Sequence, residues 1–303
     1  MTFFQPEGTA AGERLVQATC EKFQLSPHNL GITVLMYNTP SALDLGAANP
    51  QGFWQQKIRG WSWRGLELTY PASVIKLFYA VAVFEWLHRG MLTPSPELER
   101  ALHDMLAHSS NDATGYVVDM LTGTTSGPEL PPGPFETWQH QRQLVNRYFH
   151  NLGIPVYAPI NVCQKTWNEG PYGRERLFYG DNMGNRNLLT TDATAHLLHS
   201  IIGGVAVNPQ SSHHLRSLLQ RSLDPADLAA DPENQVNGFL GQALPAGAKL
   251  WSKAGWTSQV RHDAAYIERP DANALLVVVF TEGQSANTEL LPFLAAQILA
   301  RWN

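Results

Sequence analysis

The stretch YPASVIKLFYAVAVFEWL, residues 70–87, decides the fold that this sequence predicts. After Ser73 it is almost wholly apolar, and it contains one lysine, Lys76. We predict a helix of about four turns that begins near Pro71 and Ser73 and ends at Gly90, since proline favours the first turn of a helix and glycine its end. A charged amine on a core helix is costly unless it is paired. Lys76 therefore needs an explanation.

Strand patterns occur at both ends of the chain, and helical patterns lie between them. The predicted strands cover residues 31–38, 64–70, 249–253, 260–268 and 274–281, and are rich in β-branched residues or alternate in polarity. The predicted helices cover residues 13–23, 97–107, 113–121, 139–152, 191–202, 211–222, 234–244 and 287–302. This order predicts an α+β fold, an α/β sandwich. Its five-stranded antiparallel sheet comes from both chain ends, is flanked by helices and carries an all-helical insert.

The same order predicts three segments. Residues 1–90 form the N-terminal part of an α/β subdomain, together with the helix that follows Ser73. Residues 91–205 form an all-helical subdomain with a long loop at 161–187, and residues 206–303 complete the α/β subdomain. Loops of that length are uncommon unless they are functional or disordered. We therefore treat the loop as a candidate functional segment.

Composition excludes several classes of partner. The 303 residues are 44% hydrophobic, which suffices for a large core. The net charge is −5 and basic residues do not cluster, so we expect no nucleic acid. Without a run of about 18 apolar residues we expect no membrane span. No signal-peptide pattern is visible, so we expect a cytoplasmic monomer, periplasmic only if a leader has been trimmed. Cys20 and Cys163 suggest neither a metal site nor a required disulfide.

Ser73 and Lys76 lie three residues apart, which places them on one face of a helix. A serine hydroxyl is a weak nucleophile until a base removes its proton. A lysine supplies that base if burial lowers its pKa, because burial disfavours the charged form. The alternative is that Lys76 extends its amine to the surface along its own stem.

Two further segments favour the catalytic interpretation. In AHSSNDATG, Ser109, Ser110 and Asn111 begin a helical stretch, where they supply either an N-cap or a hydroxyl and an amide for a substrate. In LWSKAGW, the lysine of a Lys253-Ala254-Gly255 triplet lies near the end of a strand. A glycine there permits close approach of a ligand, and the lysine supplies positive charge.

Taken in order, the three motifs resemble those of the penicillin-recognising serine hydrolases, most closely the class A β-lactamase-like branch. The signature of that group is S-x-x-K, then S-D-N, then K-T-G. The resemblance runs from about residue 30 to the C-terminus and implies the β-lactamase/transpeptidase-like fold. It also implies that Ser73 is the acylated nucleophile and Lys76 its base. Ser109 would pass the proton to the leaving nitrogen, Asn111 would hold Lys76 and the substrate amide, and Lys253 would keep the relay electropositive.

The resemblance also implies a substrate-binding edge. The oxyanion hole would be the backbone N–H of the nucleophile and that of Trp256. Gly255 and Thr257 would border the substrate. Ala254 replaces a hydroxyl residue that helps to bind a substrate carboxylate, and Thr257, Ser258 or Arg261 is the candidate substitute. For Arg261 the alternative is a surface salt bridge.

Two other departures bear on turnover. Ser110 replaces the aspartate of S-D-N, a change that we expect to matter little. The class A motif E-x-x-L-N, whose glutamate activates the deacylating water, is absent. Glu169 and Glu175 lie in the long loop, and we expect both to be solvated.

Histidines predict no metal site. His103/His108 and His196/His199 have near-helical spacings, but the sequence shows no acidic or cysteine partner for them. His262 and Asp263 follow on a strand, where they line a site or brace the sheet. No cofactor is predicted.

The sequence therefore predicts a serine hydrolase that cleaves an amide or ester of a small or peptide-like substrate through an acyl-Ser73 intermediate. A true class A β-lactamase is one alternative. A catalytically impaired ligand-binding or penicillin-binding protein is the other. Because the water-activating glutamate is missing, we expect poor hydrolysis of β-lactams.

Overall fold

A computed structural model describes residues 2–302 and divides them into two compact units. The first unit holds the chain up to Glu67, the short piece Ala72–Val74 and the chain from Thr190 onward. The second unit holds Leu68–Pro71 and Ile75–Leu189. This division separates Ser73 from Lys76, whereas the division predicted at residues 90 and 205 keeps both in the N-terminal segment.

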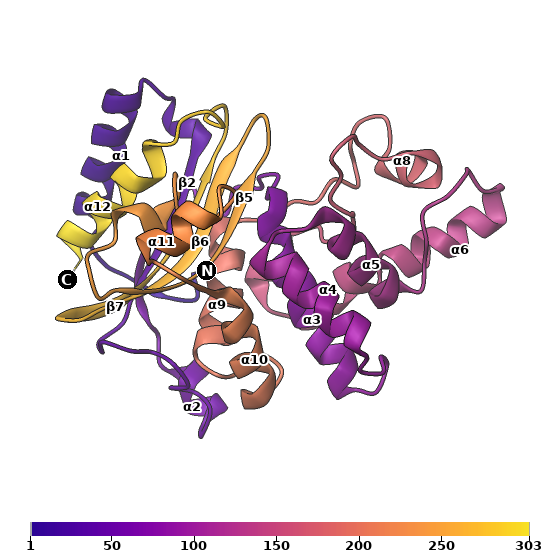
Figure 1. Ribbon diagram of the computed structural model, residues 1–303, viewed down its shortest axis with the longest axis horizontal. Coiled ribbons are helices and arrows are strands. Elements are labelled where there is room, and N and C mark those ends of the chain that lie inside the picture. The colour runs from indigo at the N-terminus through magenta and orange to yellow at the C-terminus, as the bar shows by residue number, and fades with distance from the viewer. Residues whose placement is uncertain (1, 303) are drawn as a thin grey trace. The chain divides into compact units, whose positions relative to one another are not determined.

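The first unit is built on one sheet, whose strands run through the indigo and orange parts of the chain (Figure 1). The strand order is β1-β3-β2-β7-β6-β5-β4, antiparallel except for the β1–β3 pair. The predicted α+β fold with a sheet from both chain ends is confirmed, but the sheet has seven strands instead of five. The two additional strands, β1 and β4, lie at the two edges of the sheet, and each is two residues long. The bounds are β1 Gln5–Pro6, β2 Leu30–Met36, β3 Arg59–Trp63, β4 Gln220–Arg221, β5 Lys249–Trp256, β6 Arg261–Arg269 and β7 Ala272–Thr281.

One predicted strand is wrong. Residues 64–70 are not a strand; β3 precedes them and pairs with β2 from Met36 opposite Arg59 to Ile32 opposite Trp63. Arg64 adopts a left-handed φ of 51°, which ends the extended conformation. The alternating leucines that suggested a strand are exposed.

Both faces of the sheet are buried, which explains why its strands alternate so little. On β2, Ile32 and Val34 belong to a core shared with helices α1 (Thr9–Phe23) and α12 (Leu290–Arg301). The next side chain, Thr33, faces the other way and donates a hydrogen bond to Asp192 of α9 (Thr191–Ile202) at 2.6 Å. The side chain of Thr190 caps α9, since it accepts from the backbone N–H of Ala193 at 3.0 Å.

The smaller helices of the first unit are α2 (Pro50–Gln55), α10 (Pro209–Leu219) and α11 (Pro225–Ala230). The helix predicted at 234–244 is wrong, because only a 3₁₀ helix, η4 (Leu240–Ala243), forms there. Gly238 has a left-handed φ of 75° that interrupts the segment. The helix α11 was missed, although Asp224 caps it and Pro225 begins it.

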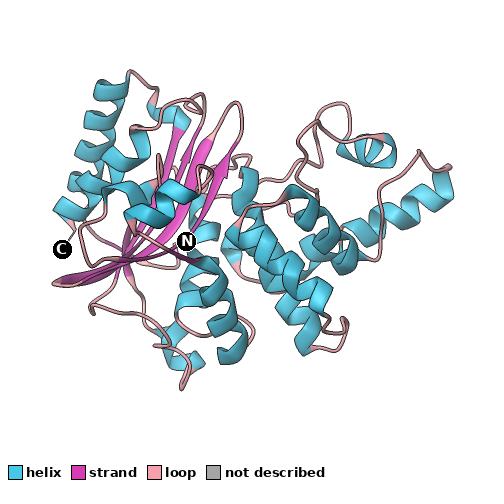
Figure 2. Ribbon diagram, viewed as in Figure 1, coloured by secondary structure: helices cyan, strands magenta, loops and turns pink. Residues whose placement is uncertain are grey.

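Among its described residues the second unit contains helices and isolated β-bridges but no β-strand of two or more residues (Figure 2). Its helices are α3 Lys76–His88, α4 Pro96–Ala107, α5 Asn111–Thr122, α6 Pro132–Arg142, α7 Leu144–Asn151 and α8 Gly173–Tyr179. The single helix predicted at 139–152 is therefore two helices that meet at Gln143, and α6 begins earlier than predicted because Pro132 starts it.

The long loop at 161–187 is more ordered than predicted. It contains α8, and bridges at both ends fix it. The amide of Asn187 donates to the carbonyl of Gln164 at 2.8 Å, and the hydroxyl of Tyr79 in α3 donates to the same carbonyl at 2.5 Å. These bonds hold the loop against α3.

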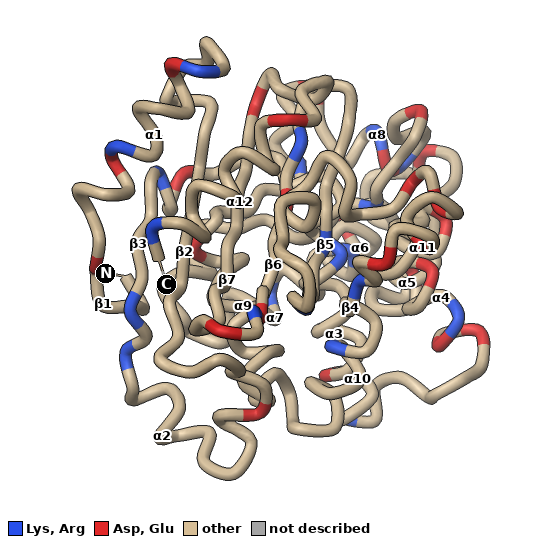
Figure 3. Tube along the Cα trace, turned by 60° about the vertical axis from the view of Figure 1, so that its left-hand side comes forward, with Lys and Arg blue, Asp and Glu red and all other residues tan. Residues whose placement is uncertain are grey.

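Charges of both signs are interspersed along the described trace (Figure 3). Across residues 2–302, no helix is both long and apolar enough to cross a bilayer.

Candidate active site

Ser73 lies on a 3₁₀ turn, η2 (Ala72–Ile75), that continues directly into α3 at Lys76. Ser73 and Lys76 are therefore one helical turn apart along the chain. The preceding residue, Ala72, has a left-handed φ of 47°, a conformation that costs a non-glycine residue about 1–2 kcal/mol. Strained backbone of this kind persists where the surrounding structure fixes it, often at functional positions.

Lys76 is fully buried, so the alternative in which its amine reaches the surface is wrong. The Nζ atom donates to the carbonyl of Ser109 at 2.5 Å, to the Ser109 hydroxyl at 3.3 Å and to Oδ1 of Asn111 at 2.9 Å. All three acceptors are neutral. Burial therefore dominates and lowers the pKa of Lys76 from 10.5 to about 7.

The Ser109–Asn111 motif connects α4 to α5. Ser109 has a left-handed φ of 56°, and the backbone N–H of Ser110 donates to the carbonyl of Asp104 at 2.9 Å. Ser110 caps α5 by accepting from Ala113 N–H at 3.1 Å. Ser110 therefore caps the helix, as the N-cap interpretation expects, while Ser109 and Asn111 contact Lys76.

Asn168 is the residue that sequence reasoning missed. Its Oδ1 accepts a hydrogen bond of 2.6 Å from Nδ2 of Asn111, and this bond and Lys76 together fix the orientation of the Asn111 amide. The loop that carries Asn168 is tied to α5 through Lys165, which donates to Asp119 at 2.6 Å. Asn168 is adjacent to Glu169 in the sequence, but nothing in an isolated WNEG stretch points to it.

The two loop glutamates differ, and one prediction about them is wrong. Glu169 is exposed, as expected. Glu175 is fully buried. Its carboxylate accepts hydrogen bonds from Arg142 at 2.5 Å and from Ser126 at 2.9 Å, which compensate for the loss of water. Its carboxylate neutralises Arg142, which is itself fully buried. Glu175 therefore joins α8 to α6, and we assign it a structural role.

In the first unit, Lys253 lies on β5 and is also fully buried. Its Nζ donates to Oε1 of Gln235 and, at 2.8 Å, to the carbonyl of Ala254. Asp263 on β6 is buried close by, and the positive charges of Arg221 and Lys253 oppose the burial that raises the pKa of Asp263 to about 7. Lys253 is thus a buried lysine with a carboxyl group near it.

His262 and Asp263 brace the sheet. Nδ1 of His262 accepts from the backbone of Thr281 on β7 at 2.9 Å, and Oδ2 of Asp263 accepts from Leu240 at 3.1 Å. Both side chains are fully buried. These two backbone contacts support the interpretation that the pair braces the sheet.

The end of β5, from Lys253 to Trp256, contains both buried and exposed residues. Gly255 pairs with His262, and Trp256 is 60% exposed. The hydroxyl of Thr257 accepts from the backbone of Gln259 at 3.2 Å, so it organises the turn that joins β5 to β6. A carboxylate-binding role for Thr257 would require that hydroxyl also to donate outward.

Arg261 is not an exposed salt-bridge residue. It is buried, donates to the carbonyl of Ser285 at 3.0 Å, and lies over the rings of Phe239 and Trp256 at 4.9 and 5.5 Å. Desolvation lowers its pKa. Ala254, also buried, belongs to the apolar core of the sheet.

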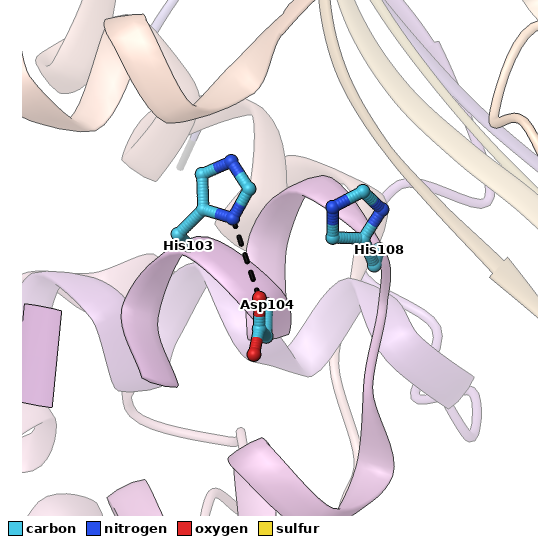
Figure 4. A group of neighbouring side chains, drawn as sticks. All are labelled: His103, Asp104 and His108. Carbon is cyan, nitrogen blue, oxygen red and sulfur yellow. Dashed lines mark hydrogen bonds and ion pairs between the residues drawn. The ribbon is translucent and has the colours of Figure 1, made fainter. Parts of the chain in front are cut away.

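The histidine pairs divide into two kinds. His196 and His199 are buried among aromatic rings, and burial lowers their pKa values to about 4 and about 3. His103 and His108 do have an acidic partner, Asp104, so the prediction that no acid completes a set here is wrong (Figure 4). Asp104 and His108 are four residues apart, which is about one helical turn, and this spacing is the sequence signal that could have identified the group.

Comparison with known proteins decides the family. The model of the beta-lactamase enzyme family matches residues 92–302, more than two thirds of the chain. The chain belongs to this family. The match contains the Ser109–Asn111 and Lys253–Gly255 motifs of this β-lactamase-like protein and leaves Ser73 and Lys76 outside it.

Solved structures share the fold of this β-lactamase-like chain. A β-lactamase from Sphaerobacter thermophilus is 17% identical, with 96% of this chain and 97% of that chain covered and a TM-score of 0.62. A mutant of PBP-A, solved as an acyl-enzyme complex with penicillin G, is 16% identical, with coverage of 98% and 97% and a TM-score of 0.63. The last common ancestor of class A β-lactamases of Gram-negative bacteria is 18% identical, with coverage of 95% and 99% and a TM-score of 0.62. A search of curated proteins found no match.

Proposed function

We propose that this β-lactamase-like protein is a serine hydrolase that cleaves an amide or ester bond through an acyl-Ser73 intermediate. The observation that carries the proposal is the environment of Lys76. Its amine is fully buried, is bonded only to neutral acceptors among the described residues, and has a pKa of about 7. A general base works best when its pKa is near the working pH.

In the proposed acylation step, Lys76 takes the proton of the Ser73 hydroxyl while Oγ attacks the substrate carbonyl carbon. The carbon–nitrogen or carbon–oxygen bond of the substrate then breaks, and the Ser109 hydroxyl passes a proton from Lys76 to the departing atom. The hydrogen bond of 3.3 Å between Lys76 and the Ser109 hydroxyl supports this route. The product is an ester of Ser73 and a free amine or alcohol.

The remaining roles rest on the family resemblance. Lys253 supplies positive charge for an anionic substrate, Asn111 holds the substrate amide, and the backbone N–H groups of Ser73 and Trp256 receive the developing oxyanion. Removing one such donor typically costs about 10²–10³ in rate. Gly255, Thr257 and Arg261 are proposed to border the substrate.

Deacylation of a bound β-lactam is proposed to be slow. Releasing an acyl group needs a base that holds and activates water. Glu175 is buried in its ion pair with Arg142. Asn168, which contacts Asn111, is a neutral amide and cannot accept a proton at neutral pH. These observations disfavour a true class A β-lactamase.

The test is incubation of the full chain with a fluorescent penicillin and a fluorophosphonate, followed by intact-mass spectrometry. We expect one covalent adduct on the wild type and none on Ser73→Ala. Full acylation of Ser73→Ala would overturn the nucleophile assignment. The Ser110→Ala variant is the control, because that hydroxyl caps α5 and is assigned no chemical step.

The second candidate is a penicillin-binding protein that acylates and then releases its ligand very slowly. The same neutral Asn168 favours it. Turnover of a simple amide or ester substrate separates the two: a single acylation without further product indicates a binder or slow transacylase, and repeated turnover indicates a hydrolase. Nitrocefin turnover within the usual enzyme range of about 1–10³ s⁻¹ would instead establish a β-lactamase.

A further inference from the structure

The C-terminal end of α4 brings together three groups that have no part in the proposed chemistry. His103, Asp104 and His108 each offer one ligand atom, and these atoms all lie within 4.8 Å of one another. Figure 4 shows the three side chains next to one another, with the contact between His103 and Asp104 marked. All three are at least partly accessible to solvent, so an ion can reach them directly.

The distances suit a small tetrahedral ion. Zinc bonds of 2.0–2.1 Å at tetrahedral angles place neighbouring ligand atoms about 3.3–3.4 Å apart. Nδ1 of His103 and Oδ1 of Asp104 are 3.3 Å apart. The imidazole rings of His103 and His108 have centroids 5.2 Å apart, and χ rotations of exposed side chains can close the remaining distance.

The ligand set also selects the kind of metal. Two imidazoles and one carboxylate suit Zn²⁺ and similar transition metals, whereas Mg²⁺ and Ca²⁺ prefer oxygen ligands. Three protein ligands leave one position of a tetrahedral ion for water. We propose that His103, Asp104 and His108 form a binding site for a divalent transition metal such as Zn²⁺.

The site adjoins the segment that contacts Lys76. His108 directly precedes Ser109, and the carbonyl of Asp104 accepts from Ser110 N–H at 2.9 Å. Ser109 in turn accepts two hydrogen bonds from Lys76. An ion held by His103, Asp104 and His108 therefore links the last turn of α4 to the residue before Ser109 and restrains that segment.

The experiment is calorimetric titration of the metal-free full chain with ZnCl₂, with far-UV circular dichroism to check folding. We expect one Zn²⁺ per chain, unaffected by excess Mg²⁺, and Zn²⁺-dependent shifts of the Ser109 and Ser110 amide resonances. Loss of an outer partner of a metal ligand alone typically costs about 10–100-fold in affinity. His103→Ala and His108→Ala should therefore weaken binding at least that much, and Asp104→Asn should weaken it too.

The matched control is His140→Ala, which removes an exposed histidine from α6. It should bind Zn²⁺ as the wild type does. Unchanged binding by folded His103→Ala and His108→Ala, or no binding by the wild type, would overturn the proposal. The readout is metal binding, so it stands or falls independently of Ser73 acylation.

Discussion

Lys76 in the second unit and Lys253 in the first are both fully buried lysines, but their surroundings differ. Lys76 contacts a carbonyl, a hydroxyl and an amide oxygen. Lys253 also donates to an amide and a carbonyl, but its charge acts on the nearby carboxyl group of Asp263.

The difference shows how one residue type serves two purposes. An amine surrounded by neutral groups loses much of its preference for the proton, because burial removes water and no negative charge replaces it. At Lys253, by contrast, the positive charge opposes the burial that raises the pKa of Asp263. We therefore propose proton transfer as the role of Lys76 and an electrostatic role for Lys253.

The largest expected effect is on acylation in Lys76→Met. Removing a positioned general base usually costs about 10²–10⁴ in rate. The fold should survive, since the loss of three hydrogen bonds to Ser109 and Asn111 is offset by removal of a buried amine. Stopped-flow labelling with a fluorescent penicillin measures the rate, and Lys57→Met, at an exposed position, is the control. Wild-type acylation by Lys76→Met would overturn the assignment of proton transfer to Lys76.

A smaller loss is expected for Lys253→Met. A hydrogen bond to a charged group is worth about 1.5–3 kcal/mol, which corresponds to roughly 10–100-fold in acylation by an anionic penicillin. Acylation by a neutral fluorophosphonate should fall less. Lys249→Met is the matched control, because Lys249 lies on the same strand and its side chain is 64% exposed. Equal losses with both probes would contradict the assignment of Lys253 to substrate charge.

The pH profile provides a sharper comparison. Because the pKa of Lys76 is about 7, the rate of acylation should rise with pH through about 7 and level off above it. Between about pH 7 and 10.5 the unfolded state binds more protons at this residue than the folded state does, so Lys76 makes the free energy of unfolding increase with pH. Urea unfolding of wild type and Lys76→Met measures this; parallel pH curves would indicate an unperturbed lysine.

The smallest expected effect belongs to Asn168→Ala. It removes one hydrogen bond from Asn111, and such a bond is worth about 0.5–1.5 kcal/mol, or up to about tenfold in the acylation rate. Asn111 then remains oriented by Lys76 alone. Glu169→Ala, an exposed neighbour, should leave the rate unchanged. Equal effects of the two variants would show that Asn168 does not orient the amide.

The sequence by itself determined the main outline. Periodicity located β2, α9 and the last three strands of the sheet, because apolar spacing follows directly from which face is buried. The three ordered motifs indicated the family. The apolar run around Lys76 left two alternatives, a buried amine and an amine that reaches the surface, and the structure decides for burial, since every residue from Lys76 to Trp86 is buried.

Only the tertiary structure decided which polar groups meet. Glu175 and Arg142 are 33 residues apart in sequence, and Asn168 and Asn111 are 57 apart, so no local pattern records either contact. The predicted strand at 64–70 is wrong for the same reason. Its side chains alternate in polarity, but which segment forms the strand, Arg59–Trp63 or residues 64–70, depends on the pairing register with β2. Burial and hydrogen bonding between distant segments are properties of the folded chain. They set the lowered pKa of Lys76, the ion pair that buries Glu175, and the grouping of His103, Asp104 and His108.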